Sequence, residues 1–161
     1  MSRLQLALNV TNLDEAVAFY SRLFATAPAK VKPGYANFAV VDPPLKLVLF
    51  EAPQGATINH LGVEVDSAEE VVSAERRLSQ AQLKTTGVDE TICCFAEKAE
   101  TWVADPDGVR WEWYVKVGDA EQMHNTVVGT LEPSAGEREG LASRKSGRED
   151  EAEAASNSCC A

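Results

Sequence analysis

Two stretches of the chain that lie 55 positions apart share the same alternation of apolar and polar residues. Residues 4–10 place leucine or valine at every second position, and residues 61–65 do the same. Strict alternation is typical of a β-strand with one buried face. The sequence therefore predicts a strand in each stretch.

Each predicted strand leads into a helical pattern. Polar capping residues follow directly, at Thr11-Asn12 in the first copy and at Asp66-Ser67 in the second, and acidic residues come next. Apolar residues then recur at helical spacing. They are Leu13, Val17, Tyr20 and Phe24 in the first copy and Val71, Val72, Ala74 and Leu78 in the second.

The two copies align as a duplicated module. Residues 5–17 match residues 60–72 without a gap, and further strands are predicted after both helices. These strands are 35–41 and 45–51 in the first copy and 91–96, 100–104 and 109–117 in the second, with an Asp-Pro turn before the last strand of each. Each module reads strand–helix–strand–strand–strand. The prediction is an α+β fold of two βαβββ modules, at about 1–55 and 56–118.

Composition divides the chain near residue 118. All eleven aromatic residues precede that point, and residues 119–161 are rich in serine, glycine, alanine and glutamate. The net charge of −10 splits equally, with −5 on each part. Such a segment buries too little apolar surface to offset its chain entropy. We therefore predict a folded domain at 1–118 and an acidic, disordered tail at 119–161.

The acidic balance excludes several classes of function. A sequence pI of about 4.7 argues against a nucleic-acid partner and against docking on an anionic membrane. No apolar run approaches the roughly 20 residues that span a bilayer, and the N-terminus lacks the pattern of a signal peptide. We therefore expect a cytoplasmic protein whose four cysteines are reduced thiols.

Two βαβββ modules within residues 1–118 resemble the vicinal oxygen chelate superfamily, also called the glyoxalase/bleomycin-resistance/dioxygenase fold. The resemblance implies a half-open mixed barrel with metal ligands on the first and last strands of each module. Gln5 and His60 head the two first strands in one alignment column, and Glu112 lies on the last strand of the second module. The fourth column falls at about Val48, which cannot bind a metal.

An amide, an imidazole and a carboxylate form a recognisable donor set. Two oxygen donors and one imidazole suit Fe(II), Mn(II), Co(II), Ni(II) or Zn(II), and the set is a variant of the 2-His-1-carboxylate triad. Ordinary structural roles are also open, since Gln5 could face solvent and Glu112 could pair with a basic residue. The shared column and the position in the fold favour a metal site.

Two pairs of adjacent cysteines complete the candidate chemistry, Cys93-Cys94 and Cys159-Cys160. Paired thiolates are soft ligands for ions such as As(III), Cd(II), Zn(II) or Cu(I). Neither pair has the C-x2-C spacing of a structural zinc site. Residues 93 and 94 can reach one ion only if the backbone bends there, because adjacent side chains on a strand point to opposite faces. The alternative is that one of these two cysteines is simply a small core residue.

Four segments bring the resemblance closer, and they are 30–39, 44–51, 59–65 and 91–96. They are similar to the organoarsenical C–As lyases and the related cadmium-induced proteins. The resemblance implies cleavage of the carbon–arsenic bond in trivalent organoarsenicals such as methylarsenite, with Fe(II) and O2, and release of arsenite. It also implies residue roles: Gln5, His60 and Glu112 bind the iron, and Cys93 and Cys94 bind the arsenic.

Further expectations concern the pocket and the tail. Tyr35 and Lys98 are candidate pocket groups, and Cys159 and Cys160 could capture arsenic at the end of a long flexible tail. A non-enzymatic protein that sequesters Cd(II) or As(III) is one alternative function, and a glyoxalase-like enzyme is another. Because one chain holds both modules and all three ligands, a monomer and a homodimer are both compatible with the sequence.

Overall fold

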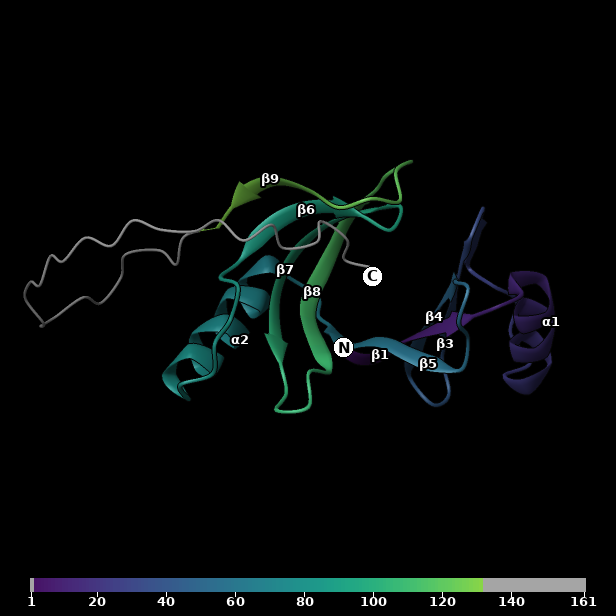
Figure 1. The fold of residues 1–161 in the computed structure, drawn as a ribbon. Coiled ribbons are helices and arrows are strands. Elements are labelled where there is room, and N and C mark those ends of the chain that lie inside the picture. The colour runs from purple at the N-terminus through teal and green to yellow at the C-terminus, as the bar shows by residue number, and fades with distance from the viewer. Residues whose placement is uncertain (1, 132–161) are drawn as a thin grey trace, which may run out of the picture.

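A computed structural model describes residues 2–131, which form nine strands and two helices (Figure 1). In chain order these are β1 (Arg3–Val10), α1 (Leu13–Leu23), β2 (Lys30–Lys32), β3 (Tyr35–Val40), β4 (Leu45–Glu51), β5 (Thr57–Glu64), α2 (Ala68–Gln80), β6 (Asp89–Cys93), β7 (Ala96–Ala104), β8 (Arg110–Asp119) and β9 (Thr126–Thr130).

The nine strands of the described residues form one mixed sheet in the order β2-β3-β4-β1-β5-β8-β7-β6-β9. β1 pairs in parallel with β4, and β5 pairs in parallel with β8, so the last strand of each module lies beside its first strand. The two first strands then pair antiparallel, from Arg3↔Glu64 to Asn9↔Thr57. The sheet ends at β2 and β9 without closing. This confirms the predicted α+β fold of two βαβββ modules joined in a half-open barrel.

Both helices begin at the predicted capping residues. The Asn12 side chain accepts a hydrogen bond from the backbone N–H of Glu15 at 3.1 Å, and the Ser67 hydroxyl accepts one from that of Glu70 at 3.3 Å. Each cap satisfies an N–H of the first turn that has no partner within the helix, which stabilises the helix by about 1 kcal/mol.

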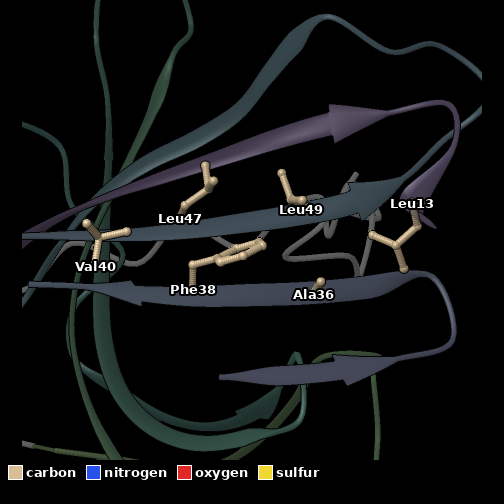
Figure 2. Close-up of a cluster of buried hydrophobic side chains, with 6 residues drawn as sticks. All are labelled: Leu13, Ala36, Phe38, Val40, Leu47 and Leu49. Carbon is tan, nitrogen blue, oxygen red and sulfur yellow. The ribbon is translucent and has the colours of Figure 1, made fainter. Parts of the chain in front are cut away.

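The helices cover the outer faces of the two halves of the sheet, so α1 and α2 lie at opposite ends of the molecule (Figure 1). Under α1, Leu6, Leu8 and Val10 of β1 pack against a buried apolar cluster. Because strand side chains alternate between faces, the intervening Gln5 and Ala7 point to the inner face. Figure 2 shows the cluster itself, made of Leu13, Ala36, Phe38, Val40, Leu47 and Leu49.

Regular structure continues past residue 118, the predicted end of the folded domain. β8 runs to Asp119, and β9 pairs antiparallel with β6. Val127 and Val128 of β9 are 54% and 59% exposed. The strand is therefore added mainly through backbone hydrogen bonds to an open sheet edge, and it leaves little hydrophobic pattern in the sequence.

Residues 132–161, with Cys159 and Cys160, lie outside the described part of the chain. Within residues 2–131, neither helix has the length and apolar character that a membrane span requires.

Candidate functional site

The inner faces of the two modules enclose a small cavity of about 30 Å³. Its wall contains every site residue that the sequence predicted within the described chain, namely Gln5, Tyr35, His60, Cys93, Cys94, Lys98 and Glu112. Val48, the fourth alignment position, lies in the same wall, together with Lys46, Phe50, Ala96, Trp102 and Tyr114. The fold thus brings to one cavity residues that lie on seven different strands and on one hairpin turn.

Strand register explains why three polar side chains meet there. Gln5 pairs with Gly62 between β1 and β5, and Gly62 pairs with Glu112 between β5 and β8. His60 precedes Gly62 by two residues and so shares its face. A Cβ at Gly62 would lie 3.1 Å from the Glu112 carbonyl oxygen and 3.4 Å from the Gln5 side chain. The glycine therefore leaves room for the Gln5 side chain beside the backbone of β8.

The ends of the three side chains form a compact triangle. Gln5 Nε2 lies 2.9 Å from His60 Nε2 and 2.9 Å from Glu112 Oε2, and the last two atoms are 3.5 Å apart. None of the three residues is more than 5% exposed. Bonds of about 2.1 Å would place neighbouring donors of an octahedral ion about 3 Å apart. The triangle therefore fits three ligands on one face of such an ion.

Gln5 would bind a metal through its amide oxygen. Its Nε2 faces His60 and Glu112, while its Oε1 accepts a hydrogen bond of 2.5 Å from the Tyr114 hydroxyl. A half-turn of the amide exchanges the two atoms, and the hydroxyl can then accept instead of donating. Residues 2–131 hold no cluster of three or more His, Cys, Asp and Glu suited to a metal. The amide is thus what completes this donor set of two oxygens and one imidazole.

The ring of His60 is held in the orientation that a ligand needs. Its Nδ1 lies 2.7 Å from the side-chain oxygen of Asn59, whose amide nitrogen donates to Asn9. Because that oxygen only accepts, Nδ1 carries the proton and Nε2 keeps its lone pair toward the triangle. The rings of Phe50 and Trp102 pack against it, with centroids 6.2 and 5.2 Å away.

A buried lysine controls the electrostatics of the site. Lys98 Nζ lies 2.5 Å from Glu112 Oε1 and 2.7 Å from Glu100 Oε2. Burial alone would lower the pKa of Lys98, but the two carboxylates outweigh it and raise that pKa above its ordinary value. Burial opposes ionisation of Glu112 as well, yet Lys98 holds the pKa of Glu112 well below its ordinary value. Burial raises the pKa of Glu100 to about 7.

The two adjacent cysteines lie at a hairpin turn and not within one strand, which corrects the predicted strand at 91–96. Cys93 pairs with Ala96, so Cys94 and Phe95 form a two-residue connection between β6 and β7. Both have positive φ, 56° and 62°, as in the tight turns that join antiparallel strands. The turn brings the Sγ atoms of Cys93 and Cys94 to 2.9 Å. The backbone bend that joint binding by both thiols requires is therefore present.

Val48 and Tyr35 form the apolar side of the cavity. Val48 pairs with Ala7 in the register of β4 and β1, and it is 3% exposed. The Tyr35 ring lies 5.5 Å from that of Phe50 and 5.4 Å from that of Phe95, and its hydroxyl accepts from the Asn37 amide. Val48, at the fourth alignment position, therefore offers no atom that could bind a metal beside the triangle.

Tyr114, Asn59 and the segment that follows β8 belong to the site but were not predicted from the sequence. Tyr114 lies two residues from Glu112, so the alternation of β8 was an available signal that both share a face. For Asn59, the only signal in the sequence was its position next to His60. The segment after β8 contacts the cysteine turn through backbone carbonyls, which every residue type carries.

Comparison with known proteins agrees with this fold. Residues 3–113 match the family described as the Glyoxalase/Bleomycin resistance protein/Dioxygenase superfamily. The chain is 57% identical over 122 residues to the cadmium-induced protein CadI of Mycobacterium tuberculosis, across 75% of this chain and 80% of that protein. It is 52% identical over 125 residues to a trivalent organoarsenical cleaving enzyme of Thermomonospora curvata, across 76% of this chain and 83% of that enzyme.

A solved structure shares the fold at low sequence identity. The Mn(II)-bound glyoxalase from Novosphingobium aromaticivorans superposes with a TM-score of 0.56 at 18% identity, over 76% of this chain and 42% of that one. With the match over residues 3–113 and two relatives above half identity, the chain belongs to the Glyoxalase/Bleomycin resistance protein/Dioxygenase superfamily.

Proposed function

We propose that this protein cleaves the carbon–arsenic bond of trivalent organoarsenicals such as methylarsenite, with Fe(II) and O2, and releases arsenite. One observation carries the proposal: the Gln5–His60–Glu112 triangle and the Cys93–Cys94 turn line the same cavity. Metal donors and paired thiols would thereby act on one small molecule. The names of the two relatives, an organoarsenical cleaving enzyme and a cadmium-induced protein, support the same reading.

The thiol pair captures arsenic by exchange. Each thiol replaces one hydroxyl of methylarsenite, so that two As–S bonds form, two As–O bonds break and two water molecules leave. The exchange involves no oxidant or reductant. With the Sγ atoms of Cys93 and Cys94 2.9 Å apart, one arsenic atom can bond to both once they are reduced. Thiolates are the soft ligands that thiophilic ions prefer.

Gln5, His60 and Glu112 would hold the Fe(II) on one side only. When bound there, Fe(II) supplies the open coordination positions and the redox chemistry that O2 activation needs. Val48 and Phe50, which are 3% and 4% exposed, add apolar surface to the wall of the same cavity. The same donor set also suits Ni(II), Co(II), Mn(II) or Zn(II), so these ions could substitute in binding.

Lys98 and Tyr35 position the reacting groups. Lys98 binds Glu112 through Oε1, which leaves Oε2 directed at the triangle. Tyr35 packs against Phe95 of the cysteine turn. The methyl group of a captured arsenical would therefore lie between this aromatic wall and the metal donors.

The capture step requires reduced thiols, so we place the reaction in a reducing compartment such as the cytosol. All proposed ligands come from one chain, and a monomer therefore suffices. Cys159 and Cys160 are proposed to bind arsenicals first and pass them to the cavity. Ending the chain after Leu131 tests this role, and unchanged turnover at limiting methylarsenite would contradict it.

Sequestration without catalysis is a second candidate. The 57% identity to a cadmium-induced protein favours it, and so does the 2.9 Å spacing of the two sulfurs, since Cd(II) is also thiophilic. However, a protein that only sequesters ions through its thiols would not need the buried triangle of metal donors beside them.

The deciding experiment loads the reduced protein with Fe(II) without oxygen, adds methylarsenite, admits O2 and measures arsenite. We expect arsenite from the wild type and none from His60→Ala or Cys94→Ser. The first variant should lose iron binding and keep arsenical binding, and the second should do the opposite. Gln80→Ala removes an exposed polar side chain at the end of α2 and serves as the control. Tight methylarsenite binding without arsenite release from iron-loaded protein would replace the proposal with sequestration.

A further inference from the structure

The turn that carries the two thiols is strained by its own sequence. Both residues of the turn, Cys94 and Phe95, hold φ in the left-handed region, at 56° and 62°. Two-residue hairpin turns of this kind normally use glycine, asparagine or aspartate, because other side chains clash with the backbone there. Neither cysteine nor phenylalanine relieves that clash. Something outside the turn must therefore hold it.

The residues between β8 and β9 provide the restraint. The backbone N–H of Cys94 donates to the Met123 carbonyl at 3.0 Å, and that of Phe95 donates to the Gln122 carbonyl at 2.9 Å. The N–H of Ala120 donates to the Phe95 carbonyl at 3.2 Å. In an isolated hairpin, these two N–H groups and this carbonyl of the turn would face solvent. Here they pair with residues of the segment 119–125, which we call the clamp.

One side chain fixes the shape of the clamp. The amide nitrogen of Gln122 lies 2.9 Å from Thr126 Oγ1, 3.1 Å from the His124 carbonyl and 3.3 Å from the Ile92 carbonyl. Ile92 directly precedes the cysteine pair on β6. Gln122 therefore stabilises the conformation of the clamp and also connects the clamp to β6, the strand that leads into the turn.

The first module also holds the clamp. Lys30 of β2 donates to the Phe95 carbonyl at 2.8 Å and pairs with Asp119 at 2.5 Å. Lys32 pairs with Glu121 at 2.8 Å and lies 5.8 Å from the centre of the Phe95 ring. The thiol turn belongs to the second module, and the metal donors come from both. These lysines hold the turn in place against the module that supplies Gln5.

We propose that the clamp at residues 119–125 holds the Cys93–Cys94 turn in the geometry in which both sulfurs bind one trivalent arsenic, with Gln122 and Lys30 as its positioning residues. This inference rests on the proposed function, and it names the device that sets substrate affinity at that site. Without the clamp, the turn relaxes toward less strained backbone angles, and the Cys94 side chain then turns away from that of Cys93. Arsenic is then held through one sulfur.

The test compares Gln122→Ala and Gln122→Glu with the wild type, in metal-free, fully reduced protein. The glutamate keeps the length of the side chain, but its carboxylate cannot donate to the two carbonyls. We expect the dissociation constant for methylarsenite to rise about tenfold in both, the loss that one or two neutral hydrogen bonds produce. Arsenic K-edge absorption should show two sulfur neighbours in the wild type and fewer in the variants.

Further variants separate positioning from general damage. Lys30→Met should weaken methylarsenite binding, and Lys30→Arg should restore part of it, because arginine can still donate to the Phe95 carbonyl and pair with Asp119. The affinity for Fe(II), measured without arsenical, should stay unchanged in all of them. Gln80→Ala, at an exposed helix end, is the matched control.

Two results would overturn the inference in different ways. Wild-type affinity with two sulfur neighbours in Gln122→Ala would refute the clamp and leave the proposed function standing. Failure of the wild type itself to bind methylarsenite through two sulfurs would refute the proposed function, and the clamp would then lose the role given to it here.

Discussion

Lys98 places a buried positive charge beside the proposed metal ligand Glu112, and its removal tests the electrostatics of the site. Its ammonium lies 2.5 Å from Glu112 Oε1 and 2.7 Å from Glu100 Oε2, and the residue is 8% exposed. Lys98→Met keeps most of the side-chain volume. The substitution leaves two buried carboxylates without the cation between them.

The magnitude follows from the burial of these charges. Breaking a buried ion pair by removing one partner costs about 3–5 kcal/mol. Part of this cost is relieved, because burial already raises the pKa of Glu100 to about 7 and this carboxyl can take up a proton near neutral pH. We therefore expect Lys98→Met to lower the free energy of unfolding by about 3 kcal/mol. For a domain of this size, that corresponds to a fall in Tm of about 10 °C.

The same substitution should strengthen metal binding, although it destabilises the fold. Lys98 and a divalent ion compete for the charge of Glu112, so affinity for Mn(II) should rise when the lysine is lost. Thermal unfolding with and without Mn(II), together with calorimetric titration, measures both effects. Lys84→Met, at an exposed lysine, should change neither. The reasoning would be refuted if the metal-free variant were as stable as the metal-free wild type, or if the variant bound Mn(II) more weakly than the wild type.

Three further predictions concern single positions. Asn59→Ala should weaken metal binding about 10- to 100-fold, because His60 loses the acceptor that orients its ring; an unchanged titration would contradict this. Gly62→Ala should also weaken metal binding, since its Cβ would lie 3.4 Å from the Gln5 side chain; metal affinity equal to that of the wild type would show that the side chain has room to move. Hydrogen bonds from Lys116 and Lys30 lower the pKa of Asp119 to about 2. These pairs therefore stabilise the fold above the ordinary aspartate pKa, and this stabilisation is lost as pH falls through about 2. An NMR titration of this carboxyl with a midpoint near 4 would contradict that assignment.

Local patterns in the sequence are enough to define the two modules and the face on which the site lies. Leucine and valine at alternate positions of β1 decide which side packs under α1, and so direct Gln5 to the other side. The gap-free repeat then placed His60 in the same column, and Glu112 followed from its place on the last strand of its module. These features can be predicted because a strand or helix that buries one face carries apolar residues at a regular spacing along the sequence.

Features that depend on strand register and on backbone hydrogen bonds emerge only in the folded chain. In the register of β7 and β8, Lys98 lies opposite Lys116 and Glu112 lies opposite Trp102, so the long Lys98 side chain reaches Glu112 along the inner face that both residues share. The bend at Cys94 and the addition of β9 to the sheet edge rest on backbone N–H and carbonyl groups. Every residue carries these groups, so their partners leave no mark in the side-chain pattern, and only the folded chain shows where each one is satisfied.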